Sequence, residues 1–132
     1  MKPTYIILII ILVVVVGWMA IRFIIGGNED TWIKDERGVW IEHGHPNFVP
    51  DYILEQSNAI ECALNLYEQA KNSGMNFSSQ CLGTCEDYAV DIVHVPRTSE
   101  DNLAENQCED YRAGKVSKFI ELDSKEDIVR IV

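Results

Sequence analysis

Four cysteines are the residues whose type and spacing most directly suggest chemistry in this chain. They are Cys62, Cys81, Cys85 and Cys108, and the middle two form a C-x3-C pair. An even number of cysteines in a short chain is typical of structural disulfides formed in an oxidising compartment. The sequence therefore predicts two disulfides, each worth about 2–4 kcal/mol to a small domain.

Four cysteines can pair in three ways, and two of these are attractive. One joins Cys62 to Cys85 and Cys81 to Cys108, whereas the other joins Cys62 to Cys81 and Cys85 to Cys108. We favour the first pairing, because it would attach the predicted main helix to the start of a strand and close an acidic loop.

A reactive C-x3-C pair is the alternative use of these cysteines. Cys81 and Cys85, with His94 downstream, would then serve thiol redox chemistry or metal handling. Membrane-tethered thioredoxin-like copper proteins use such a pair, but no βαβ pattern precedes it here. A zinc site made by all four cysteines is less favoured, because structural zinc usually takes two close pairs.

Two histidines form the other candidate metal site. His43 and His45 flank Gly44 and follow Glu42, which places three donors suited to zinc or copper close together. A fixed fourth ligand is not evident, and the Gly and Pro content is typical of a solvated turn. We therefore predict no metal and no cofactor. If the chain did bind a metal, His43 and His45 would be the candidate ligands.

Trp32, Trp40, His94 and Arg97 are the candidate ligand-contacting or interaction residues. Each has an ordinary structural alternative: packing for the tryptophans, a hydrogen bond within a strand for His94, and a salt bridge for Arg97. The chain contains no G-x-S-x-G, H-E-x-x-H, P-loop or dinucleotide fingerprint. The sequence therefore favours a binding role over an enzyme and predicts no catalytic residue.

An apolar segment from Thr4 to Ile25 precedes all of these residues, with Arg22 as its single charge. At 1.5 Å per residue its helix would span a hydrocarbon core of about 30 Å. A signal peptide cleaved after Ala20 is the alternative, but the run is long and Trp18 is bulky for the site before the cut. We predict an uncleaved anchor over residues 1–26 and an extracytoplasmic domain over residues 27–132.

Charge separates the two parts of the chain. All 21 acidic residues follow Gly27, as do nine of the 11 Lys and Arg, so residues 27–132 carry 9 − 21 = −12. This charge disfavours nucleic acid and anionic lipid surfaces as partners of the domain. Flanking charges nearly balance across the apolar segment. The cysteines therefore decide the predicted orientation, which places the N-terminus in the cytoplasm and the domain outside.

Residue patterns predict an α+β fold for the domain, with one main helix on an antiparallel sheet of hairpins. Thr31–Glu42 and residues 116–132 are typical of hairpins. Residues 57–72 have helical spacing, with Ser57 as the expected N-cap and Gly74 at the C-terminal end. Residues 75–84 are predicted to form a loop, and residues 86–95 a strand that ends before Pro96.

The stretch from Glu29 to Ile33, followed by Trp40 and His43-Gly44-His45-Pro46, resembles a hairpin module of short, membrane-tethered or secreted prokaryotic proteins of uncharacterised function. The resemblance implies a location and a prokaryotic source and carries no activity. The functional hypothesis is accordingly a single-pass membrane protein whose extracytoplasmic domain binds an envelope protein or a surface ligand. A tethered thiol-redox or metal-handling domain is the alternative.

Overall fold

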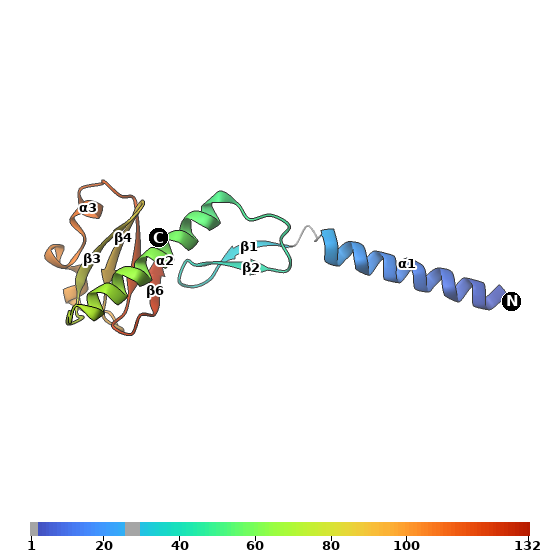
Figure 1. Cartoon of the computed structure of the whole chain (residues 1–132), viewed down its shortest axis with the longest axis horizontal. Helices are drawn as coiled ribbons and strands as arrows, with labels where there is room; N and C mark the ends of the chain where they lie inside the picture. The colour runs from blue at the N-terminus through green and yellow to red at the C-terminus, as the bar shows by residue number, and fades with distance from the viewer. Residues whose placement is uncertain (1–2, 26–29) are drawn as a thin grey trace. The chain divides into compact units, whose positions relative to one another are not determined.

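The computed structural model describes residues 3–25 and 30–132, and the chain divides into two units. One unit comprises Met1–Ile33 and Ile41–Val49; the other, called the sheet unit below, comprises Lys34–Trp40 and Pro50–Val132. Figure 1 shows the helices and strands in chain order. The predicted boundary between anchor and domain, at residues 26 and 27, lies outside the described residues.

Helix α1 (Pro3–Ile25) confirms the predicted apolar helix. It is the one helix among the described residues that is long and apolar enough to cross a membrane, and none of its span is buried by protein. Its charged residue Arg22 forms an ion pair with Asp30. The apolar side chains of α1 are therefore exposed along the helix.

Helix α2 (Asp51–Asn72) starts earlier than the sequence pattern suggested. Pro50 occupies the N-cap position in an extended conformation, and Asp51 places an acidic side chain in the first turn. Ile53 and Gln56 are buried, so the buried stripe begins before Ser57. The prediction of Ser57 as N-cap is wrong, whereas the predicted C-terminal end is confirmed by Gly74, whose φ is 79°.

A four-stranded sheet has the order β3-β4-β5-β6, formed by Gln80–Cys85, Tyr88–Ile92, Lys118–Leu122 and Ile128–Ile131. Strands β4 and β5 are parallel, so the predicted antiparallel sheet is in fact mixed. The predicted 75–84 loop contains most of β3, whose pattern is obscured by a register shift between Cys81 and Gly83. The predicted strand over 86–95 is shorter, because Glu86 lies in the turn with a φ of 54°.

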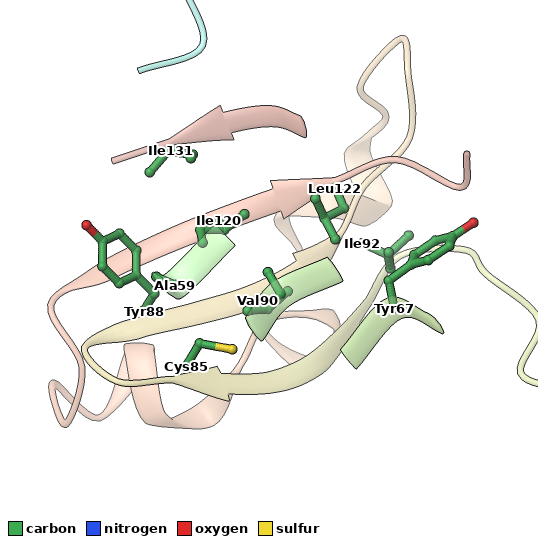
Figure 2. Packing of buried hydrophobic residues seen from close by; sticks show 10 residues of the cluster. Ala59, Tyr67, Cys85, Tyr88, Val90, Ile92, Ile120, Leu122 and Ile131 are labelled. Atoms are coloured by element: carbon green, nitrogen blue, oxygen red, sulfur yellow. The ribbon is translucent and has the colours of Figure 1, made fainter. Parts of the chain in front are cut away.

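One face of the sheet packs against α2 and forms the main core. Alternate residues of β4 and β5 point to this face, as Figure 2 shows for Val90 and Ile120. The buried cluster consists of Ala59, Ala63, Tyr67, Cys85, Tyr88, Val90, Ile92, Ile120, Leu122 and Ile131. The disulfide Cys62–Cys85 joins α2 to β3 within this layer.

The connection from Val93 to Ser117 packs against the other face. It contains two 3-10 helices, η1 (Ser99–Asn102) and η2 (Ala104–Asn106), and the short helix α3 (Glu109–Arg112). Ala89, Cys108 and Val116 form a second buried cluster there, with Phe119 against it. The disulfide Cys81–Cys108 attaches the connection to β3. Both disulfides follow the pairing favoured by the sequence.

The N-terminal hairpin is also confirmed. Strands β1 (Thr31–Lys34) and β2 (Trp40–His43) form a two-stranded sheet. The intervening loop contacts β6, because the backbone N–H of Ile131 donates to the carbonyl of Arg37 at 2.7 Å. At Gly38, which has a φ of 87°, an added Cβ would lie 2.2 Å from the Ile131 carbonyl oxygen. Glycine is therefore required at this contact.

Truncating a buried leucine should destabilise the fold far more than truncating an exposed one. Leu122 is fully buried, whereas Leu54 on α2 is 51% exposed. We expect Leu122→Ala to lower the free energy of unfolding by about 2–5 kcal/mol, and Leu54→Ala by less than about 0.5 kcal/mol. Denaturant titration of the two variants measures the difference, and equal losses would contradict the observed packing.

Candidate functional site

A small cleft lies on the sheet face opposite α2. Its floor is formed where Asp91 on β4 pairs in register with Glu121 on β5. The cavity has a volume of about 70 Å³, room for about two water molecules. Its lining is Ser79, Asp91, Ile92, Val93, Arg97, Asp101, Asn106, Gln107, Tyr111, Phe119, Glu121 and Arg130. The cleft thus gathers Arg97 and several acids, which lie on different elements of the chain.

Glu121 holds the two arginines of the cleft. Glu121 is 5% exposed, and its carboxylate accepts a hydrogen bond from Arg97 Nη1 at 2.8 Å. Arg130 donates from Nε at 3.1 Å and from Nη2 at 3.2 Å. Charge-assisted hydrogen bonds of this kind offset the free-energy cost of burying a carboxylate. Arg97 therefore has the salt bridge that sequence analysis gave as its ordinary structural role.

Asp101 organises the loop that carries His94 and Arg97. Its carboxylate accepts the backbone N–H of His94 at 3.0 Å and of Thr98 at 2.7 Å, and it contacts His94 Nδ1 at 3.0 Å. Burial acts to raise the pKa of Asp101, but these bonds and one from Ser79 outweigh it and lower the pKa to about 2. Asp101 is therefore an ionised, fully satisfied anchor for the loop.

Asp91 is the exception among the cleft acids. It is 9% exposed, and its carboxylate accepts the backbone N–H of Cys108 at 3.1 Å. Among the described residues, no basic side chain forms an ion pair with it. Burial raises the pKa of Asp91 to about 6, and the negative charge of Glu121 adds to this, whereas the Cys108 bond and Arg97 act in the opposite direction.

The Asp91 carboxylate also lies beside a disulfide. A carboxylate oxygen of Asp91 and the sulfurs of Cys81 and Cys108 all lie within 4.8 Å of one another. The two sulfurs are bonded to each other, so the thiolates that a soft metal would take exist only after reduction. The C-x3-C residues Cys81 and Cys85 belong to different disulfides and are not bonded to each other.

The remaining candidates from the sequence lie elsewhere. Trp40 contacts the Tyr52 ring at 5.0 Å, and both line a separate hollow of about 230 Å³ in the sheet unit. The Trp32 indole N–H donates to the carbonyl of Phe48 at 2.9 Å. His43 and His45 are exposed, and no cluster of three metal-ligating side chains in residues 3–25 and 30–132 includes them. They stay sequence-based candidates.

Sequence reasoning missed Asp91, Glu121 and Arg130 as site residues. Two of them carried a signal, because Asp91 and Glu121 are single acids within mostly apolar strands, in YAVDI and KFIEL. A lone acid in such a strand either lies on a face exposed to solvent or is buried as part of a site. Only the position of the connection from Val93 to Ser117 decides between these, and no local pattern encodes that position.

Comparison with known protein families, with characterised proteins and with solved structures finds no match to this chain. Only the geometry of the cleft therefore bears on the role of its residues.

The raised pKa of Asp91 predicts a pH-dependent stability. The folded chain keeps this proton up to about pH 6, whereas the unfolded chain loses it near 3.8. The folded state binds more protons between these values, so the Asp91 contribution to the free energy of unfolding falls as pH rises through this window. We expect Asp91→Asn to gain on the order of 2 kcal/mol over wild type between pH 4 and pH 7.

Denaturant titrations at pH 4, 5, 6 and 7 measure this gain. Asp127→Asn, an exposed change of the same chemistry in the turn before β6, should run parallel to wild type. An Asp91→Asn variant that loses stability on going from pH 4 to pH 7, relative to wild type, would show that the ionised carboxylate is stabilising.

Proposed function

We propose that this protein is a membrane-anchored, extracytoplasmic binding module that receives a basic group of an envelope protein in the cleft. Its N-terminus would lie in the cytoplasm and α1 would remain as an uncleaved anchor in the lipid. The exposed apolar surface of α1 and the two disulfides support this placement. The hairpin resemblance to membrane-tethered prokaryotic proteins agrees with it.

The unpaired carboxylate of Asp91 is the observation that supports a basic ligand. The cavity is lined by three acids and two arginines, and Glu121 already holds both arginines. Asp101 is stabilised by hydrogen bonds within its loop, so Asp91, when ionised, is the cleft acid left without a compensating group of positive charge. An ammonium or guanidinium group in the cleft would supply that cation and remove the cost of a buried, unpaired charge.

The charge of the domain supports the same class of partner. Residues 27–132 carry nine basic and 21 acidic side chains, which would attract a basic protein segment and repel nucleic acid. The cavity of about 70 Å³ admits a side-chain head group and little more. The surrounding acidic surface would therefore contribute to the rate of association, and the cleft to its specificity.

A lysine analogue tests the binding site directly. N-acetyl-lysine methylamide, added to the oxidised full-length protein in nanodiscs, should shift the amide resonance of Cys108, whose N–H donates to Asp91. Binding should strengthen as pH rises through about 6, because the ammonium group pairs with ionised Asp91. Asp91→Asn should weaken it about 10-fold or more, and Asp127→Asn should not.

The norleucine analogue, which lacks the ammonium group, is the matched ligand control. Equal shifts with norleucine, or unchanged affinity in Asp91→Asn, would exclude recognition of a basic group by this cleft.

Cysteine labelling in intact cells tests the placement. Lys125→Cys puts a thiol at an exposed position in the turn before β6, whereas Lys2→Cys puts one ahead of α1. A membrane-impermeant maleimide should label Lys125→Cys in intact cells and Lys2→Cys only after permeabilisation. The four native cysteines should react only after reduction. The reverse pattern for the two variants would place the domain in the cytoplasm.

A further inference from the structure

The two disulfides of the chain lie in different surroundings. Cys81 is an exposed residue on β3, at the edge of the sheet, and its partner Cys108 is 1% exposed. Cys62 and Cys85 instead pack with the main core, and Cys85 is fully buried. Cys62 is partly buried, so an attacking thiolate reaches the Cys81 end of one bridge more readily than either end of the Cys62–Cys85 bridge.

The surroundings of Cys108 favour a thiol over a thiolate. Its sulfur lies 3.4 Å from the carbonyl oxygen of Gly83 and 3.4 Å from that of Val90. Carbonyl oxygens repel a negative sulfur and accept a hydrogen bond from an S–H group. If a thiolate attacked the sulfur of Cys81, the sulfur of Cys108 would be the leaving group. A nearby proton donor would therefore be needed for Cys108 to leave readily.

Asp91 is placed to be that donor. Its carboxylate lies within 4.8 Å of both sulfurs, a span that one water can bridge, and it lines the adjacent cavity. The Cys108 N–H holds Oδ1, which leaves Oδ2 to carry a proton. Burial raises the pKa of Asp91 to about 6, so part of the population is protonated near neutral pH. The charged and titratable groups around it are Glu121, Arg97, Asp101, Arg130 and Tyr111.

We propose that Cys81–Cys108 is a thiol–disulfide exchange site for an extracytoplasmic dithiol substrate, in which Asp91 donates a proton to the leaving sulfur of Cys108. A substrate thiolate attacks the sulfur of Cys81, the Cys81–Cys108 bond breaks, and a mixed disulfide forms between substrate and Cys81. Cys108 leaves with its electron pair and takes the proton of Asp91, becoming a thiol.

The second substrate thiol completes the exchange. As a thiolate it attacks the substrate sulfur of the mixed disulfide, and Cys81 departs and is protonated from solvent. The substrate dithiol has lost two electrons and become a disulfide, and the Cys81–Cys108 bridge has gained two electrons and become two thiols. The site therefore oxidises a dithiol, and the reverse sequence reduces a disulfide. An ammonium group paired with ionised Asp91 would remove this proton, so the exchange is expected of the cleft without a basic ligand.

Dithiothreitol is the probe dithiol for the test. The full-length protein in nanodiscs is reduced for timed intervals between pH 5.5 and 8, quenched with a maleimide, and each disulfide is followed separately by peptide mass mapping. Rates are divided by the thiolate fraction of the probe. We expect Cys81–Cys108 to open about 10-fold or more faster than Cys62–Cys85, with a corrected rate that falls as pH rises above about 6.

Asp91→Asn should slow the opening of Cys81–Cys108 about 10-fold at pH 6 and remove the pH dependence, while Asp127→Asn leaves both unchanged. The Cys62–Cys85 rate reports on folding, because it would rise if a variant loosened the core. Should Asp91→Asn unfold, the wild-type rates decide. Equal opening of the two disulfides, or a corrected rate independent of pH in wild type, would overturn the proposal, whatever the outcome of the lysine-analogue titration.

Discussion

Parallel hydrogen bonding between β4 and β5 requires the chain to leave β4 at Ile92 and return before it enters β5 at Lys118. A parallel pair cannot be closed by a tight turn, so a long connection has to cross one face of the sheet. With α2 already on the other face, the connection covers the face that bears Asp91 and Glu121. Burial of these acids thus follows from strand direction.

The disulfides compensate for the small apolar content of this arrangement. The α2 layer has a continuous core of large aliphatic and aromatic side chains, whereas the cluster under the connection consists of three buried residues with Phe119 beside them. Such a cluster buries too little surface to order a long acidic segment alone. Cys81–Cys108 closes a sequence separation of 27 residues and limits the freedom of the unfolded connection.

Local patterns predicted the elements whose sequence carries their own signal. The apolar helix, both hairpins and the C-terminal end of α2 follow from periodicity and turn residues, and the disulfide pairing follows from which elements need attachment. Strand β3 was missed because Gly83 and a register shift interrupt its alternation. The parallel pairing was missed because β4 and β5 have the same pattern whichever way they pair.

The cleft shows why long-range placement matters more than residue type for this chain. Glu121 and Asp91 are neighbours in register, yet Glu121 forms ion pairs with two arginines. Asp91 instead accepts one backbone N–H and lies beside a disulfide. The difference arises because Arg130 lies on β6, the neighbour of β5, whereas Cys108 is bonded to Cys81 on β3, the neighbour of β4. Of these two adjacent acids, Glu121 is the centre of an ion-pair network, whereas burial raises the pKa of Asp91 to about 6 and allows this carboxyl group to exchange a proton near neutral pH.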